Sequence, residues 1–238
     1  MLESSFRVRV SRSIGGSTLK VVTIAAAKGG ATKTTVTALL AVRATKNGER
    51  VALFDLNGDQ GDLTQWYALR SKPKRGPNFL RLIPVQKISL DVEVCRAEGF
   101  DWVFMDTPPS ELDVIDNAIL KSDAVVIPVR PSIFDIQSVT PIVEACRVRN
   151  RPFSFLLSAV DTKMPKLTES AAAALANDGP IFATRIRYLQ AYITAVAHGK
   201  TGPEVDKSLQ AEVDSLWDEV ERLAATAKHS VGTERRAS

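Results

Sequence analysis

The chain has 238 residues, 45% of them hydrophobic and 24% charged, with a formal net charge of +4. A chain of this length and composition suits one large globular domain whose core needs no covalent staples. The two cysteines, Cys95 and Cys146, form no C-x-x-C pair, which argues against a disulfide scaffold or a zinc site and favours a reducing cytoplasm. No apolar run is long enough to span a bilayer, and the N-terminus lacks the apolar core of a signal peptide.

Short apolar runs recur along the chain after a polar, basic segment, residues 1–17, that we interpret as an N-terminal tail. Several of these runs are almost unbroken, which is the pattern of strands buried on both faces of a parallel sheet. The predicted strands cover residues 18–27, 49–55, 78–85, 101–106, 123–129 and 152–160.

Segments of helical length lie between and after these runs. Residues 33–48 carry an apolar face and end in a glycine, which suits a helix C-terminus. Residues 135–150 and 208–228 are also predicted to be helices, and residues 229–238 to be a polar C-terminal tail. Because strand and helix alternate, we expect a doubly wound α/β fold, with a mostly parallel sheet flanked by helices and right-handed crossovers.

The loop between the first strand and the first helix, AAAKGGATKTT at residues 25–35, is similar to a phosphate-binding loop with unusual residues. The P-loop pattern G-x-x-x-x-G-K-[ST] aligns on Lys33 and Thr34. Ala27 and Thr32 stand where the two glycines of that pattern belong. The loop is therefore either a damaged nucleotide site or a different kind of one.

The position of this loop favours phosphate binding. A helix N-terminus at the carboxyl edge of a parallel sheet offers free backbone N–H groups to an anion, and Gly29 and Gly30 let the backbone approach it closely. We expect Lys33 to reach the β- and γ-phosphates and Thr34 to offer its hydroxyl to Mg²⁺. The alternative is a glycine turn that only caps a strand, but strand, glycines, Lys-Thr and helix in this order are much more specific.

Aspartates end two of the predicted strands at the same edge of the sheet. Asp106 ends the run DWVFMD and is expected to hold Mg²⁺ through water, while Asp55 ends VALFD and is followed by a polar loop with Asp59 and Asp62. Carboxylates that face a phosphate loop are costly unless a cation lies between them, which favours a metal site at Thr34, Asp55 and Asp106. The alternative is that Asp55 or Asp106 only caps the following helix.

These stretches together resemble the ParA/MinD family of deviant Walker A ATPases. KGGATKTT matches the pattern K-G-G-x-x-K-[ST], DLNGDQGDLT the loop D-x-D-P-Q-G-x-x-T, and DWVFMDTPPS the pattern D-x-x-x-x-D-x-P-P. The resemblance runs from about Leu19 to about Ala227 and is closest to small ParA-type partition proteins that lack an N-terminal helix-turn-helix domain. It implies a single ATPase domain over residues 18–228 that takes ATP and Mg²⁺ as cofactors.

The resemblance also assigns roles within the loop. The nucleotide site it implies comprises Lys28, Gly29, Gly30, Ala31, Thr32, Lys33, Thr34 and Thr35. In this family the first lysine, here Lys28, reaches across an ATP-dependent homodimer to the partner's phosphates, where a second cation neutralises charge on the transferred γ-phosphoryl group. Lys28 and Lys33 are therefore both predicted to be catalytic. Thr32 stands where most relatives carry glycine, and its Cβ requires a different turn of the loop.

The water that attacks the γ-phosphate needs an orienting group, and the loop after Asp55 offers two candidates. Asn57 replaces the second acid of the family's D-x-D pattern, and the loop carries one residue more than that pattern. Asp59 can swing in to take over the role, or Asn57 can hold the water by a hydrogen bond and leave slow turnover. We favour Asp59 as the catalytic residue and keep Asn57 as the alternative.

The function implied by the resemblance is DNA segregation by a cytoplasmic, nucleoid-associated ATPase. An ATP-bound homodimer would bind double-stranded DNA without sequence preference, and a ParB-like partner would stimulate hydrolysis. Two alternatives stay open: a nucleotide-gated DNA-binding scaffold with little hydrolysis, and a ParA-like positioner of DNA-transfer or protein cargo. A membrane-positioning relative would end in a basic amphipathic helix, whereas this chain ends KHSVGTERRAS, so we expect no membrane partner.

Basic residues offer several candidate contacts to DNA. Clusters lie at residues 70–75, 147–151 and 185–187. A solvated surface explains each of them equally well, and the absence of interleaved aromatic residues favours contacts to phosphates that are non-specific and salt-dependent. We favour Arg185, Arg187 and Lys200, because the two arginines follow a predicted short strand, 181–184, and would lie on the nucleotide side of the sheet.

Overall fold

The computed structural model describes residues 19–58, 61–70 and 79–234, with side chains as far as Ala227. Six strands form one sheet in the order β3-β2-β4-β1-β5-β6, and every pair in it is parallel. The strands are β1 (Lys20–Ile24), β2 (Val51–Asp55), β3 (Leu80–Leu82), β4 (Trp102–Asp106), β5 (Ala124–Val129) and β6 (Phe153–Leu157). The expected α/β fold is confirmed, and the sheet is parallel throughout rather than mostly parallel.

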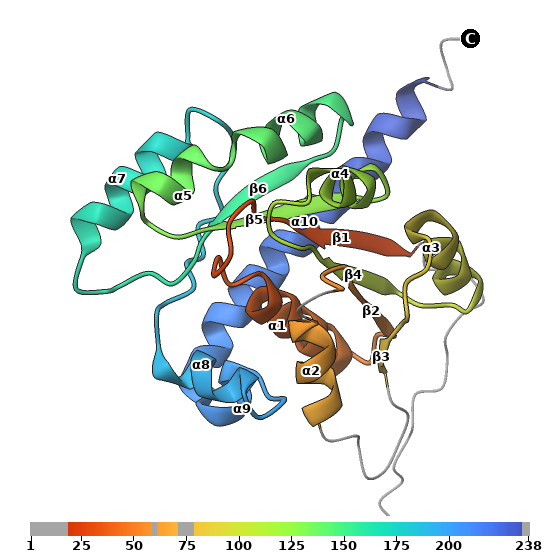
Figure 1. Cartoon of the computed structure of the whole chain (residues 1–238), viewed down its shortest axis with the longest axis horizontal. Helices are drawn as coiled ribbons and strands as arrows, with labels where there is room; N and C mark the ends of the chain where they lie inside the picture. The colour runs from red at the N-terminus through yellow and green to blue at the C-terminus, as the bar shows by residue number, and fades with distance from the viewer. Residues whose placement is uncertain (1–18, 59–60, 71–78, 235–238) are drawn as a thin grey trace, which may run out of the picture.

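Helices connect the strands and cover both faces of the sheet (Figure 1). They are α1 (Lys33–Lys46), α2 (Asp62–Leu69), α3 (Ile88–Ala97), α4 (Leu112–Leu120), α5 (Ile133–Gln137), α6 (Thr140–Val148), α7 (Pro165–Leu175), α8 (Gln190–Val196), α9 (Gly202–Val205) and α10 (Gln210–Glu234), with a short 3₁₀ turn at Lys207–Leu209 before the last. Helices α1, α2, α8 and α10 pack on one face around residues such as Val22 and Trp217, and α3 to α7 pack on the other.

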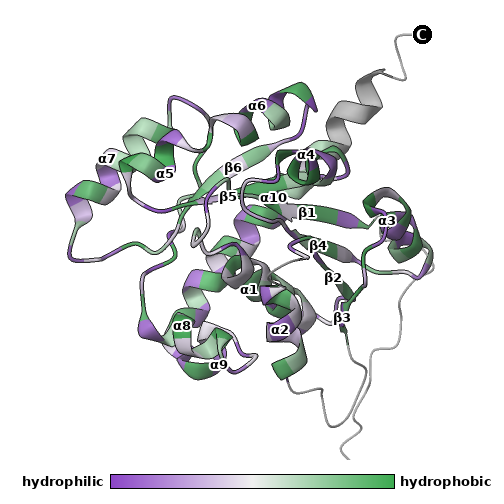
Figure 2. Cartoon of the chain, in the orientation of Figure 1, coloured by the Kyte–Doolittle hydropathy of each residue, from purple (hydrophilic) through white to green (hydrophobic). Residues whose placement is uncertain are grey.

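The strands are hydrophobic on both sides, as the nearly unbroken apolar runs predict. Along β1, Val22 faces the core under α1 and α10, whereas Val21 faces the core under α3. Figure 2 shows hydrophobic colour along the sheet and mixed colour on the surrounding helices. Because both faces of the sheet are buried, polar side chains are found at the strand ends, and the carboxyl ends are where open α/β sheets bind ligands.

The register of the central strands brings the strand-end aspartates together. Ile24 of β1 is opposite Asp106 of β4, and Asp106 is in turn opposite Asp55 of β2. The carboxyl ends of three neighbouring strands are therefore level, and Thr34, which follows the loop after β1, contacts Asp106.

Three of the expected boundaries are corrected. The single helix expected over 135–150 is two helices, because Pro141 in the first turn of α6 has no N–H to continue a helix from α5, which ends at Gln137. The strand expected over 181–184 is only an isolated bridge from Ile181 to Phe155. Helix α10 runs to Glu234, so helical structure continues past the point where the polar tail was expected to begin.

The terminal segments 1–17 and 235–238, residue Asp59 and most of the basic cluster 70–75 lie outside the described residues. Over residues 19–58, 61–70 and 79–234, no helix is both long enough and apolar enough to cross a bilayer.

Candidate nucleotide site

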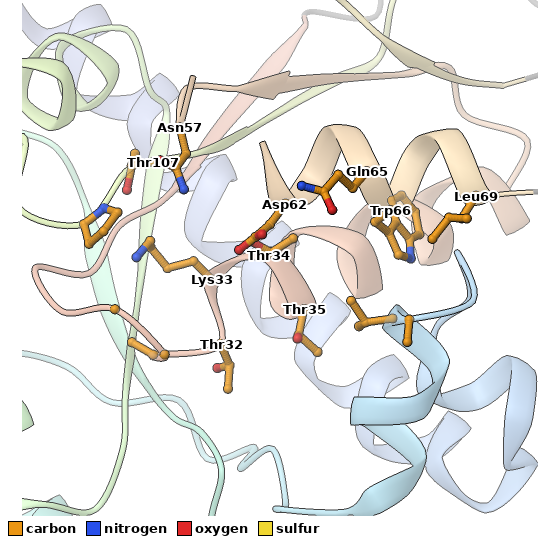
Figure 3. Close-up of a pocket in the computed structure, with 16 residues that line it drawn as sticks. Thr32, Lys33, Thr34, Thr35, Asn57, Asp62, Gln65, Trp66, Leu69 and Thr107 are labelled. Carbon is orange, nitrogen blue, oxygen red and sulfur yellow. The ribbon is translucent and has the colours of Figure 1, made fainter. Parts of the chain in front are cut away.

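A cavity of about 480 Å³ opens at the start of α1 (Figure 3). Loop and helix residues 29–35 line it, together with Asn57, Asp62, Gln65, Trp66, Leu69, Thr107, Pro109, Val196 and Ala197. The loop after β1 thus forms one wall, and α2 and α8 form the opposite one. Seven of the eight positions predicted for the nucleotide, Gly29 to Thr35, lie in this wall, and Lys28 does not.

Lys33 is the cation inside the cavity. Its side chain is almost fully buried, and Nζ donates to the Lys28 carbonyl at 3.3 Å. Burial lowers the pKa of Lys33, and the charges of Asp106 and Asp62 oppose that effect. A buried ammonium group that uses one donor on the loop backbone has further donors available for an anion such as phosphate.

The Thr34 hydroxyl and the Asp106 carboxylate form the oxygen-rich part of the site. Thr34 Oγ1 donates to Asp106 Oδ2 at 2.6 Å, while the buried Asp106 Oδ1 has no partner within the part of the chain that the structure describes. Burial raises the pKa of Asp106 to about 7; the bond from Thr34 works against this rise, and the charge of Asp55 adds to it. A cation at Oδ1 would keep this carboxylate ionised.

These residues fit Mg²⁺. A hydroxyl and an unpartnered carboxylate oxygen are the hard oxygen ligands that Mg²⁺ prefers, and Mg²⁺ usually takes only one or two of them from protein, with water and phosphate completing its shell. Accordingly, no group of three or more His, Cys, Asp or Glu side chains in the described residues is arranged to hold a metal by itself.

Asp55 organises the loop next to the cavity. Its Oδ1 accepts a hydrogen bond from the Asn57 backbone N–H at 3.1 Å, and its Oδ2 accepts from both the N–H and the hydroxyl of Thr64 at 2.8 Å. These bonds tie the end of β2 to the first turn of α2. The predicted metal role of Asp55 stays a prediction beside this structural one.

Lys28 lies apart from the other loop residues. Its Nζ lies 5.3 Å from the centre of the Phe134 ring, and Phe134, in α5, is 68% exposed. Lys28 thus lies over an exposed aromatic ring and is not among the residues that line the cavity. That position is compatible with the predicted contact to a second subunit.

Arg130 is a neighbour of the loop that the sequence patterns did not single out. It follows β5, pairs with the buried Asp135 at 3.0 Å, and its Nη1 lies 3.5 Å from where a Cβ on Gly30 would be. Asp62 and Gln65 of α2 were likewise absent from the predicted site. The only sequence signal for them is their position, immediately after a motif strand or loop, because their approach to the cavity depends on tertiary packing.

The two arginines predicted to contact DNA are held by intramolecular ion pairs. Arg185 pairs with Glu169 at 2.8 Å, and Arg187 pairs with Glu212 at 2.7 Å. An isolated bridge sets Arg187 opposite Val160, beyond the carboxyl end of β6. Lys200 is exposed in the segment between α8 and α9, and its backbone carbonyl accepts a hydrogen bond from Trp66 Nε1 at 2.9 Å.

The rival basic cluster at 147–151 is also bonded within the chain. Arg147 and Arg151 donate to the carbonyls of Asp178 and Leu120, and Arg149 pairs with Asp116 at 2.6 Å. The cluster lies between α6 and β6, at the amino end of that strand. It is therefore on the rim opposite to the cavity.

Comparison with known proteins decides the family. Residues 22–202 match the model of the CobQ/CobB/MinD/ParA nucleotide binding domain. The chain belongs to this family. The resemblance to ParA/MinD proteins is thereby confirmed, and the matched residues include the loop and the start of α1 that line the cavity.

Three ParA/MinD-type relatives match at similar identity. Protein virC1 of Rhizobium rhizogenes is 29% identical over 50% of this chain and 52% of its own length. The chromosome-partitioning ATPase Soj of Thermus thermophilus is 28% identical over 51% of this chain and 59% of its own. The maintenance of carboxysome distribution protein A of Halothiobacillus neapolitanus is 27% identical over 84% and 97%. The chain thus spans little more than half the length of the first two and nearly all of the third.

Solved structures of the family share the fold. The septum site-determining protein MinD from Pyrococcus horikoshii, complexed with Mg-ADP, matches with a TM-score of 0.69 at 17% identity, over 88% of this chain and 98% of that one.

Proposed function

We propose that the chain is a ParA-type Mg-ATPase that segregates DNA. The observation that carries the proposal is the Thr34–Asp106 pair beside the buried Lys33, with one carboxylate oxygen lacking a partner in the described residues. Thr34 and Asp106 would hold Mg²⁺, which would neutralise charge on the β- and γ-phosphates of ATP. Lys33 and the loop backbone would bind the same phosphates.

The proposal includes an ATP-dependent homodimer. Lys28 does not line its own cavity and lies over the exposed Phe134, which supports a contact from Lys28 to a nucleotide held by a second copy. The sequence's candidate for the water-orienting residue is Asp59, with Asn57 as its alternative; Asn57 lines the cavity, and Asp59 lies outside the described residues. The dimer would bind double-stranded DNA through Arg185, Arg187 and Lys200 in the cytoplasm, on the nucleoid, and a ParB-like partner would stimulate hydrolysis.

The test combines light scattering and phosphate release with Mg-ATP and DNA. Lys28→Ala should retain nucleotide binding, because Lys33 stays in the cavity, yet lose ATP-dependent dimerisation. Lys46→Ala, which removes an exposed lysine from the far end of α1, serves as the matched control and should dimerise like the wild type. A Lys28→Ala variant that dimerises normally would overturn the cross-subunit role. Wild-type dimers that bind DNA without releasing phosphate would favour the scaffold alternative.

A second candidate function is the positioning of protein cargo. The match to the carboxysome distribution protein, over 97% of that protein's length, favours it. Deleting the gene separates the two functions: DNA partition requires faster plasmid or chromosome loss, whereas cargo positioning requires normal DNA retention with a mislocated protein assembly.

A further inference from the structure

Asp62 is an acidic side chain at the nucleotide cavity that the family pattern leaves unspecified. It is the first residue of α2 and lines the cavity with Lys33 and Thr34. Figure 3 shows its carboxylate directed toward Thr34. The charge of Asp62 acts on Lys33 as well as on Asp106, which places it within electrostatic range of both.

The chain fixes this direction through the residues on either side of Asp62. Gly61 adopts a left-handed conformation, with φ +59°, so the loop turns sharply and α2 begins at once. The Gly61 N–H donates to the Asn57 carbonyl at 2.8 Å, and Thr64 holds Asp55 through two hydrogen bonds. Asp62 is therefore carried by a turn that is bonded to the end of β2, which is the kind of rigid support a reacting group needs.

Among the residues that the structure describes, the two strand-end acids near the cavity already have uses: Asp55 is bonded to the protein, and Asp106 keeps one oxygen for the proposed Mg²⁺. Asp55 accepts three hydrogen bonds from Asn57 and Thr64, and Asp106 accepts the Thr34 hydroxyl. Asp62, by contrast, is exposed to the cavity and makes no hydrogen bond or ion pair with any residue that the structure describes. A carboxylate is an acceptor only, so it is available to a donor in the cavity such as water.

We propose that Asp62 is a catalytic residue that orients the attacking water by accepting a hydrogen bond from it; the proposal rests on the ATP hydrolysis proposed above. In the step it assists, the water oxygen bonds to the γ-phosphorus while the bond from that phosphorus to the β–γ bridging oxygen breaks. ADP leaves with the bridging oxygen, one proton of the water stays on the phosphate product, and the other passes to solvent. Because the transition state is loose, holding the water in line supplies much of the catalysis.

Two other roles for Asp62 make different predictions. An acid in the first turn of a helix stabilises that helix through its dipole, in which case its loss lowers stability and weakens ATP and ADP alike. A carboxylate that holds Mg²⁺ would, when removed, raise the Mg²⁺ concentration that ATP binding requires. Orientation of water predicts neither effect, because removing a negative charge beside the triphosphate leaves ATP binding unchanged or tightens it.

The decisive variant is Asp62→Asn, which keeps the side chain's size but replaces a charged acceptor by a neutral amide oxygen that holds the water more weakly. We expect phosphate release with Mg-ATP and DNA to fall about 100-fold, the usual cost when a reacting group is displaced by about 1 Å. Affinity for a fluorescent ATP analogue should be equal to or tighter than wild type across a Mg²⁺ titration, with ADP affinity and melting temperature unchanged. Asp113→Asn is the matched control, because Asp113 is an exposed acid in the first turn of α4, away from the cavity.

Several results would overturn the proposal. These are wild-type phosphate release by Asp62→Asn, a raised Mg²⁺ requirement, or a parallel loss of ATP and ADP binding. Asp59→Asn measured alongside gives a further check, since loss of turnover there with normal turnover in Asp62→Asn would assign the water to Asp59. If the wild-type chain releases no phosphate, the proposed ATPase function fails and the role of Asp62 with it. Normal wild-type turnover that Asp62→Asn does not change contradicts only the role of Asp62.

Discussion

Thr32 has a backbone conformation that suits glycine, at the entrance to α1. Its φ is +61° and its ψ is +18°, in the left-handed region that β-branched residues rarely adopt. Its hydroxyl is buried and has no hydrogen-bond partner among the described residues. The residue therefore combines backbone strain with a buried polar atom that has no partner in the described residues, inside the loop that we propose binds phosphate.

Thr32→Gly should stabilise the protein and tighten nucleotide binding. Relief of the left-handed strain is worth about 1–2 kcal/mol and the unpaired hydroxyl about 1 kcal/mol, against about 1 kcal/mol for the extra freedom of glycine in the unfolded chain. We expect the free energy of unfolding to rise by about 1–2 kcal/mol in urea denaturation. Ala159→Gly, which relieves the same strain at φ +50° outside the loop, should stabilise slightly without changing ATP affinity. A less stable Thr32→Gly variant would show that the side chain supports the loop.

At the scale of single residues, the sequence correctly predicted which residues line the cavity where those residues follow one another in a motif. Gly29 to Thr35 could be placed at the cavity because strand, loop and helix are contiguous. Arg130 could not, because it reaches Gly30 from the end of β5, a contact that only the packed sheet creates. Asp62 was visible as an acid in a polar loop, but its direction depends on the turn at Gly61.

Helix α2 links the nucleotide cavity to the segment that carries Lys200. Its first turn is bonded to Asp55 through Thr64. At its other end, Arg70 donates to the Gly199 carbonyl and pairs with Glu204 at 2.9 Å. Glu204 also accepts hydrogen bonds from the backbone N–H and the hydroxyl of Thr201, which caps α9. One end of α2 is thus fixed to the end of β2 beside the cavity, and the other end is fixed to the segment that carries Lys200.

Glu204→Gln should weaken this attachment in a pH-dependent way. Burial alone would raise the pKa of Glu204, but the bonds from Arg70 and Thr201 outweigh burial and hold the pKa below its usual range. The ionised form therefore stabilises the folded state above the unfolded pKa of about 4.3, and this contribution is lost as pH falls through the lower folded value.

The expected loss is about 1 kcal/mol at pH 7, because solvent screens this exposed carboxylate, and it should shrink below pH 4. Urea denaturation of the wild type and the variant at pH 7 and at pH 3 measures this loss of unfolding free energy. Glu98→Gln, in the exposed ion pair with Arg81, is the control and should have little effect at either pH. An equal loss at pH 3 and pH 7 would mean that charge plays no part.

Elements were predicted well where the pattern was long and uninterrupted. The helix at 33–48 was found because its apolar face repeats over several turns, and the structure has α1 at Lys33–Lys46. The segment 135–150 has the same kind of pattern, but Pro141 divides it. Residues 181–184 are apolar enough for a strand but pair with the edge strand β6 at a single bridge. Whether a segment adds to the edge of a sheet depends on how it fits the adjacent strand as well as on its composition.

At the scale of the whole molecule, the two rims of the sheet differ. The carboxyl rim carries the nucleotide cavity, Lys28 and the bridge that holds Arg187, so an ATP-bound dimer could present them together. The amino rim carries Arg147 and Arg149, both bonded within the chain. The sequence could assign both rims because β-strand direction in a parallel sheet fixes them, but it could not show that each candidate arginine already has a partner.

Replacing Arg185 and Arg187 by Gln should weaken binding to all duplex sequences equally, because phosphate contacts carry no sequence information. Gln is preferable to Glu, since a Glu at 187 would face Glu212, which also accepts the Tyr192 hydroxyl at 2.6 Å. Two lost phosphate contacts should reduce the slope of log affinity against log salt by about 1.8 per protomer. Filter binding from low to physiological salt, with Mg-ATP and two unrelated duplexes, measures both quantities.

The matched control is the double variant Arg147→Gln with Arg149→Gln, which removes the same charge from the opposite rim and should leave the slope unchanged. If that pair flattens the slope instead, DNA binds the amino rim and the proposed footprint is wrong.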